Sequence, residues 1–383
     1  MKIALGMIIR NLDTDDILAR FIENAEKHGH KLDCLIVAHT HDMNPEVAET
    51  LRRKLPLHSI DIKAPAYLAE QFRRLGMSDD AAHALLDCPI DPGRGMMPYG
   101  YKRTLVAAEA ILRGMDVLFF VDYDVYPTVL KMTPGGPALE EADFFGAHLE
   151  HLNSGAQVTT GEYSGHNILP PASFDGMDDL LLGLQKEDMA EYWRSSLTHK
   201  GLTVQPFERE SQPCTKVLGG NCAIKLSAFK YLPPFFSSWH AVGGETFLNR
   251  GEDTVLGLGI AKTGMVCIDI GLNPMHDTYK KYPIVPDIIS SLADQGRFYY
   301  ACTGWVGRNP LFNYVRGEDL KYARDYRRER LNRGLRALSR YTNNAKYINV
   351  LNNFDASWNS LPRYIEEYER SMESWSEFVD KVW

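Results

Sequence analysis

The chain has 383 residues, enough for one large α/β domain with an extension or for two domains. Hydrophobic residues make up 44% and charged residues 24%, which argues against a disordered protein, and the net charge of -8 argues against nucleic acid as a partner. The sequence has no run of about 20 apolar residues and no CxxC pair among its six cysteines. We therefore expect a cytoplasmic protein without a membrane span or a zinc knuckle.

Strands and helices alternate in the first third of the chain. The apolar run 3–9 predicts a buried strand, and apolar residues at helical spacing predict a helix that starts at Asp13 and ends at Gly29. Further strands are predicted at 32–38 and 58–62, on either side of a helix at 45–54. This alternation is typical of a parallel α/β sheet.

A second strong signal comes near residue 120. A helix predicted over 101–113 leads into the continuous apolar run 116–121, which is typical of a strand buried on both faces. The run ends in Asp122-Tyr123-Asp124, and ligands of open α/β sheets bind at the carboxyl ends of the strands. Carboxylate oxygens suit Mg²⁺ or Mn²⁺, so this motif predicts a divalent metal site.

The same motif has two other interpretations. Asp-x-Asp-x-Val after an apolar strand is also found in haloacid-dehalogenase-like phosphatases, in which Asp122 would be the nucleophile and Asp124 the acid–base group. That motif usually lies on the first strand of the chain, whereas three β-α units precede it here. The other interpretation is that acidic residues simply end a strand.

Three more motifs follow in order. A small-residue turn precedes a strand, an acidic pair opens a helix predicted over 252–263, and a histidine follows a strand and a turn: Gly219-Gly220-Asn221, Gly251-Glu252-Asp253 and Met275-His276-Asp277. Together with Asp122-Tyr123-Asp124, their order and spacing over about residues 1–310 resemble nucleotide-sugar-dependent glycosyltransferases of the GT-A fold.

The resemblance implies a fold and an activity. The fold is α/β of the GT-A type, a mostly parallel twisted sheet flanked by helices, with a nucleotide-sugar-binding half over 1–124, an acceptor half over 125–315 and a helical C-terminal extension over 316–383. The activity is that of a hexosyltransferase, which uses Mn²⁺ or Mg²⁺ and moves a sugar from a UDP- or GDP-sugar to a hydroxyl of a glycan or small molecule. A non-catalytic nucleotide- or sugar-binding protein with this fold is an alternative.

The resemblance also implies roles for single residues. Asp124 and His276 would hold the metal, which would neutralise the charge that develops on the diphosphate leaving group. Asp122 would reach the metal through water, or would bind the donor ribose. Glu252 and Asp253 would face the acceptor, with Asp253 as general base in an inverting enzyme. Simple capping of the helix by these two acids is the alternative interpretation.

Further donor contacts are expected around the ends of the strands. Lys102 or Arg103, at the start of a helix, would meet the pyrophosphate. The nucleoside base would lie over the first two strand ends. The predicted donor contacts are completed by Arg10, Asn11, His39, Tyr123, Gly220 and Asn221.

The last 68 residues change in character. Residues 321–340 hold eight Lys or Arg and two acids. This predicts either contact with an anionic membrane surface or an anionic acceptor, or a solvated helix that packs on the catalytic domain. We favour the packed helix because the whole chain is acidic. An apolar stripe between Tyr364 and Val382 indicates core packing or a homodimer contact.

Overall fold

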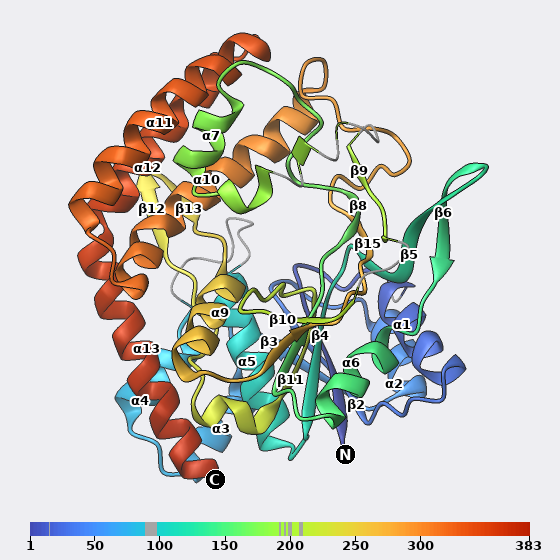
Figure 1. Cartoon of the computed structure of the whole chain (residues 1–383). Helices are drawn as coiled ribbons and strands as arrows, with labels where there is room; N and C mark the ends of the chain where they lie inside the picture. Colours follow the sequence, from blue (N-terminus) through green and yellow to red (C-terminus); the bar gives the residue numbers. More distant parts are fainter. Residues whose placement is uncertain (15, 89–97, 191–192, 195–196, 198–200, 207–209) are drawn as a thin grey trace.

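The computed structural model describes residues 1–383 apart from 15, 89–97, 191–192, 195–196, 198–200 and 207–209 (Figure 1). An eight-stranded sheet lies at its centre, with the order β10-β14-β7-β11-β4-β1-β2-β3. The pairs β3–β2, β2–β1, β1–β4 and β14–β7 are parallel, whereas β11 runs antiparallel to both of its neighbours and β10 antiparallel to β14. The strands are β1 (Ile3–Ile9), β2 (Cys34–His39), β3 (Leu57–Asp61), β4 (Val117–Asp122), β7 (Val158–Thr160), β10 (Gln212–Pro213), β11 (Asn221–Lys225) and β14 (Cys267–Asp269).

The N-terminal half follows the alternation predicted from the sequence. Its helices are α1 (Asp16–Lys27), α2 (Pro45–Lys54), α3 (Ala66–Arg74), α4 (Asp79–Leu86) and α5 (Tyr99–Leu112). Helix α2 begins as predicted, because the Asn44 side chain accepts a hydrogen bond from the backbone N–H of Glu46. Pro45 has no backbone N–H that would need an acceptor in the first turn. Helix α1 begins at Asp16 rather than at Asp13.

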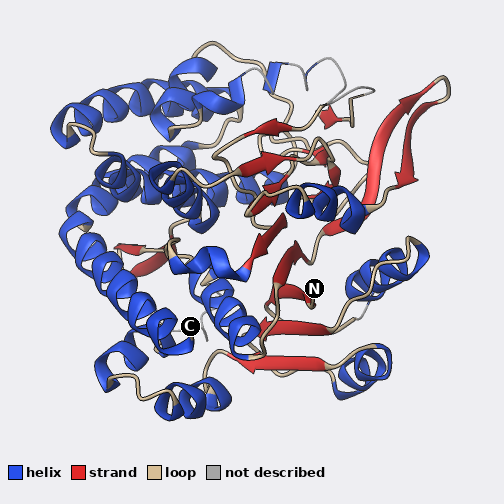
Figure 2. Cartoon of the chain, turned by 60° about the horizontal axis from the view of Figure 1, so that its bottom comes forward, coloured by secondary structure: helices blue, strands red, loops and turns tan. Residues whose placement is uncertain are grey.

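Strand β4 shows why the sheet needs a helical layer on each face. Phe119 and Val121 pack in one core cluster with Phe144 of α6 (Phe144–Asn153), and Leu118 and Phe120 pack in another cluster with α5. Successive side chains of a strand point to opposite faces, so an unbroken apolar strand must be covered on both. Helices on both sides of the strands are visible in Figure 2. The expected α/β fold class, a mostly parallel sheet flanked by helices, is confirmed.

A second, five-stranded sheet rises from the carboxyl end of β4. Its order is β6-β5-β15-β8-β9, and its β5–β6 hairpin projects from the body (Figure 1). Strands β12 and β13 form a separate pair. The bounds are β5 (Val125–Thr133), β6 (Gly136–Glu141), β8 (Ser164–His166), β9 (Leu202–Thr203), β12 (Trp239–Val242), β13 (Glu245–Leu248) and β15 (Pro274–Asp277).

The helical C-terminal segment packs against the rest of the chain along its whole length. Helix α11 lies on α7, and α13 packs against α4. Phe378 of α13 also meets Phe72 of α3, with 5.1 Å between the ring centroids. Arg328 and Arg330 of the basic segment pair with Asp355 and Asp179. The helices are α7 (Met177–Leu184), α9 (Glu252–Thr263), α10 (Leu292–Arg316), α11 (Leu320–Tyr341), α12 (Val350–Asn359) and α13 (Leu361–Val382), with short 3-10 turns η2 (Glu187–Met189), η3 (Leu226–Lys230) and η4 (Ala345–Asn349).

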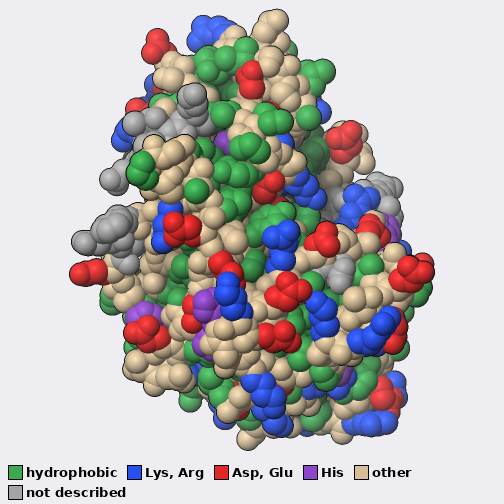
Figure 3. All heavy atoms as spheres, turned by 90° about the vertical axis from the view of Figure 1, so that its right-hand side faces the viewer, with side chains coloured by type: hydrophobic (Ala, Val, Ile, Leu, Met, Phe, Trp, Pro, Cys, Tyr) green, Lys and Arg blue, Asp and Glu red, His purple; other side chains and the backbone are tan. Residues whose placement is uncertain are grey.

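The described surface is mixed in charge. On the face shown in Figure 3, acidic and basic side chains are interspersed. None of the helices in the described residues combines the length and apolarity that crossing a membrane requires.

The predicted boundary after residue 315 falls at the end of α10, and the division into halves stays a prediction.

Glycines allow α7 and α11 to pack closely, which gives a first test. A Cβ at Gly334 would lie 2.4 Å from the backbone Cα of Leu180. We expect Gly334→Ala to lower the free energy of unfolding by about 1–3 kcal/mol, because two backbones must move apart. The control is Gly296→Ala in α10, where a Cβ meets open space and the gain in helix propensity is up to about 1 kcal/mol. Urea denaturation of both variants measures the difference, and equal effects would contradict close packing.

Candidate functional site

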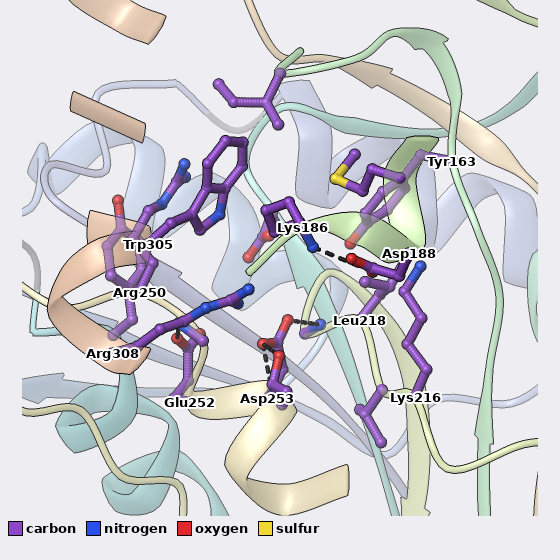
Figure 4. A pocket seen from close by; sticks show the side chains of 18 of the residues that line it. Tyr163, Lys186, Asp188, Lys216, Leu218, Arg250, Glu252, Asp253, Trp305 and Arg308 are labelled. Carbon is purple, nitrogen blue, oxygen red and sulfur yellow. Dashed lines mark hydrogen bonds and ion pairs between the residues drawn. The ribbon is translucent and has the colours of Figure 1, made fainter. Parts of the chain in front are cut away.

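A cavity of about 580 Å³ opens at the carboxyl end of β4. The central sheet and the start of α9 form one side, and η2 with α10 forms the other (Figure 4). Predicted site residues from separate motifs meet here, since the cavity is lined by Arg103, Asp122, Tyr123, Asp124, Glu252, Asp253 and His276.

Arg103 joins the strand end to the later motifs. Its Nη2 donates to Asp122 Oδ1 at 2.7 Å and its Nε to Glu252 Oε1 at 3.1 Å, while its Nη1 donates to the carbonyl oxygen of Gly219 at 2.6 Å. Only 2% of its side chain is exposed. Burial opposes the charge, but Asp122 and then Glu252 outweigh it and hold the pKa of Arg103 above its usual value.

The turn at 219–220 is shaped around these polar groups. A Cβ on Gly219 would lie 2.7 Å from Arg103 Cζ, and one on Gly220 would lie 2.5 Å from Asp122 Oδ2. The Gly220 N–H donates to Tyr163 Oη at 3.0 Å. Gly219 and the predicted donor contact Gly220 therefore both leave room for the ion pair between Arg103 and Asp122.

Asp124 and His276 lie side by side at the base of the second sheet. The backbone places them there, because β15 pairs with β5 so that His276 is opposite Val125, and the Asp277 N–H donates to the Asp124 carbonyl oxygen at 2.9 Å. His276 Nε2 is 3.3 Å from Asp124 Oδ1, and its Nδ1 is 3.2 Å from Thr278 Oγ1. Burial alone would raise the pKa of Asp124, but His276 outweighs it and holds that pKa below its usual value.

This pair fits a divalent cation. Two atoms 3.3 Å apart can each lie about 2.1 Å from one metal ion, and the contact with Thr278 orients the ring. Within the described ranges, no three His, Cys, Asp or Glu side chains come together as a metal cluster. Further ligands of a cation would therefore be water and ligand oxygens. Asp122, whose Oδ1 accepts from Arg103, stays a predicted contact through water or the ribose.

Glu252 and Asp253 open helix α9 and face different partners. Glu252 is buried against Arg103, and burial followed by the charge of Asp253 raises the pKa of Glu252. Asp253 is half-buried; its Oδ2 accepts from the Gly219 N–H at 3.1 Å and its Oδ1 from the Thr254 N–H at 2.7 Å. These two hydrogen bonds orient its carboxylate at the cavity wall. Glu252 forms a salt bridge with Arg103, whereas Asp253 forms none with the residues that the structure describes.

The residues predicted near the nucleoside lie outside this cavity, at the ends of β1 and β2. His39 Nδ1 is 2.8 Å from the carbonyl oxygen of His41, and Arg10 Nε is 3.4 Å from His41 Nε2. Lys102 is fully buried and donates to the carbonyl oxygen of Ile9 at 2.5 Å. Burial lowers the pKa of Lys102 to about 7. Lys102 and Arg103 were alternative candidates for the pyrophosphate, and only Arg103 lines the cavity.

Two other predicted contacts have structural partners. The Asn11 Nδ2 donates to Asp13 at 3.3 Å. The Asn221 Nδ2 donates to the carbonyl oxygens of Glu162 and Leu272, and His148 Nε2 lies 3.1 Å from Asn221 Oδ1. Asn221 is fully buried and holds neighbouring segments together behind the cavity. Its role as a donor contact stays a prediction.

Sequence reasoning missed the far wall of the cavity. Lys186, Arg250 and Arg308 line it, with Trp305 beside them (Figure 4). One signal was present, since Arg308 interrupts an apolar stretch of α10 that is otherwise buried. A charge inside an apolar helical run needs either a partner or a ligand.

Comparison with known proteins gives no family. No protein-family model and no curated protein matches the sequence. Solved structures with some likeness include a glucosyl-3-phosphoglycerate synthase from Mycobacterium tuberculosis with phosphoglyceric acid, and the same synthase with Mn²⁺, UDP-glucose and phosphoglyceric acid. Both have a TM-score of 0.40 and 13% identity, over 83% of this chain and 80% of theirs. A mycobacterial protein has a TM-score of 0.38 and 15% identity, over 80% of this chain and 74% of its own. Likeness at this level assigns neither activity nor substrate to this chain.

The Arg103 contacts predict a large effect of a small change. Arg103→Lys should lower the free energy of unfolding by about 2 kcal/mol or more, because an ammonium group cannot serve three acceptors placed around a planar fork. Urea denaturation measures this. Arg74→Lys, at an exposed surface pair with Glu70, is the matched control and should change stability by less than about 0.5 kcal/mol. A similar small effect at Arg103 would contradict the central position given to it.

His148 predicts a dependence of stability on pH. Burial lowers its pKa to about 3, so the unfolded chain binds a proton below about pH 6.5 that the folded chain does not. The free energy of unfolding of the wild type should therefore fall by up to about 1.4 kcal/mol per pH unit below pH 6.5, compared with that of His148→Gln. Denaturation curves at pH 7.5, 6.5, 5.5 and 5.0 test this. The exposed His83→Gln serves as control, and parallel pH profiles for wild type and His148→Gln would contradict the prediction.

Proposed function

We propose that this protein is a metal-dependent glycosyltransferase that moves a sugar from a nucleoside-diphosphate sugar to an acceptor hydroxyl. The observation that carries the proposal is the pair Asp124–His276, 3.3 Å apart, at the edge of a cavity that also holds Asp253. A cation-binding pair at the carboxyl end of a parallel sheet, facing a fixed carboxylate across one cavity, suits transfer between two bound substrates.

Asp124 and His276 would hold the cation, and a bound cation would stabilise the negative charge of a diphosphate leaving group. An imidazole nitrogen is a better ligand for a transition metal than for Mg²⁺, so we propose Mn²⁺ as the preferred ion. The proposed nucleoside side is the group of residues at the ends of β1 and β2, where Arg10 and His39 lie.

The reaction breaks the bond between the anomeric carbon and the diphosphate oxygen and forms one between that carbon and the acceptor oxygen. The acceptor hydroxyl loses its proton. Asp253 would take this proton in an inverting reaction, because its carboxylate is held at the cavity wall by two backbone N–H groups. In a retaining reaction the same carboxylate would position the acceptor, and the proton of the acceptor hydroxyl would pass to the departing diphosphate oxygen.

The metal pair gives the test of this proposal. Wild type should bind UDP or GDP at least about tenfold more tightly with Mn²⁺ than with EDTA, and Asp124→Asn or His276→Gln should each remove that gain. Isothermal titration calorimetry measures both. Asp116→Asn, at the opposite end of strand β4, is the matched control and should bind like wild type.

Two results would contradict the proposal. One is that neither nucleoside diphosphate binds the wild type with Mn²⁺ present. The other is release of phosphate from p-nitrophenyl phosphate that Asp122→Asn abolishes, which would instead indicate a phosphatase with Asp122 as nucleophile.

A further inference from the structure

Arg308 is a buried cation with at least one donor that no described residue pairs. Only 8% of it is exposed, and its Nε is buried without a hydrogen-bond partner in the described part of the chain. Its guanidinium lies 4.8 Å from the ring of Phe312. Burial lowers the pKa of Arg308 to about 10, although the nearby charges of Asp253 and Asp188 oppose that shift. Buried donors are nearly always paired, so the unpaired Nε–H is a donor available to a ligand.

Lys186 brings a second positive charge to the same place. It is 9% exposed, its Nζ is 5.7 Å from the ring of Trp305, and its single ion pair among the described residues is with Asp188 at 3.2 Å. Burial first and the charge of Arg308 second lower the pKa of Lys186 to about 8. The two cations therefore repel each other, and an anion between them would relieve that repulsion.

The cations stand next to the proposed base. Arg308 reaches into the space between Lys186 and Asp253 (Figure 4). It also lies against the start of α9, where a Cβ on Gly251 would be 2.9 Å from Arg308 Nη1. Asp253 is two residues further along that helix, so one small molecule can reach both residues.

From these positions we infer that the acceptor carries an acidic group, a carboxylate or a phosphate, which Arg308 and Lys186 bind while the acceptor hydroxyl faces Asp253. The inference rests on the proposed function, since it names the class of acceptor for the same cavity. Arg308 offers a planar pair of donors that matches either anion, and Lys186 adds a point charge. Phe312 and Trp305 limit access of water and strengthen both contacts.

The arrangement separates this anion from the donor diphosphate. Donor binding is proposed at Asp124 and His276, on the second sheet, whereas Arg308 belongs to α10 and Lys186 to the turn before η2. An anion on the helical side should therefore bind while a nucleoside diphosphate is in place.

The experiment measures binding of inorganic phosphate and of acetate to the full chain, each with and without saturating UDP and Mn²⁺. Thermal shift titrations are made at constant ionic strength, balanced with sodium chloride. At least one of the two anions should bind saturably both with and without UDP and Mn²⁺. The substitution Arg308→Gln should weaken the affinity for that anion by about tenfold or more. Lys186→Met should also weaken it, and Arg336→Gln, an exposed arginine on α11, should bind like wild type.

The two anions distinguish the acidic group. Stronger binding of phosphate indicates a phosphorylated acceptor, and stronger binding of acetate a carboxylate. The stability of the variants is a second measurement, because removal of an unpaired buried charge should leave the melting temperature of unliganded Arg308→Gln unchanged or raised.

Three outcomes would overturn the inference: neither anion binds, the affinity is the same in Arg308→Gln and Arg336→Gln, or UDP with Mn²⁺ displaces the anion. Displacement would mean that these cations serve the donor. If UDP and GDP fail to bind at all, the proposed function fails, while the titrations without nucleotide still decide whether Arg308 and Lys186 form an anion site.

Discussion

The hydrogen-bonded guanidinium of Arg103 is the constraint on which the rest of the site depends. Its three acceptors lie 19, 116 and 149 residues away in the sequence, on the end of β4, the turn before β11 and the start of α9. Loss of any one of these acceptors would leave part of the buried guanidinium of Arg103 without solvent or partner, which is costly. The three segments must therefore assemble together. The glycines at 219 and 220 follow from the same demand, since a side chain at either would occupy the space of the ion pairs.

The same constraint divides the two acids of the strand-end motif. Asp122 ends β4 and points to Arg103, whereas Asp124 lies past the strand end, where backbone pairing with β15 sets it beside His276. Two residues of one chemical type, two positions apart, thus meet different partners. Asp122 is neutralised by Arg103, a permanent cation of the protein, whereas the buried Asp124 lies beside a histidine that lines the cavity. This asymmetry explains why the proposed cation ligands are Asp124 and a histidine of β15 rather than the two carboxylates of the motif.

Local patterns predicted the sheet well and the site only in part. The bounds of β1, α2 and β4 were predicted to within a residue or two. The signals were apolar strands, helical periodicity and Asn44 before Pro45, and each of them lies in or next to the element that it specifies. The meeting of Asp124 with His276 followed from a resemblance and not from spacing. Three features could not be predicted from the sequence, because each depends on residues from distant segments. They are the inward direction of Arg103, the separate position of Lys102 and the burial of Arg308.

The helical part of the chain has a use that its amphipathic pattern alone did not reveal. Helix α10 carries Arg308, and α12 and the turn before it hold α10 in place: Ser357 Oγ donates to the Val306 carbonyl oxygen at 3.2 Å, and Tyr347 Oη to that of Gln295 at 3.1 Å. An unpaired buried cation lowers the stability of the folded chain, so the surrounding packing must stabilise the fold by more than that loss. The two sheets thus position Asp124 and His276, while α10, held by the helices that follow it, carries Arg308. Residues from the sheets and from α10 line the same cavity.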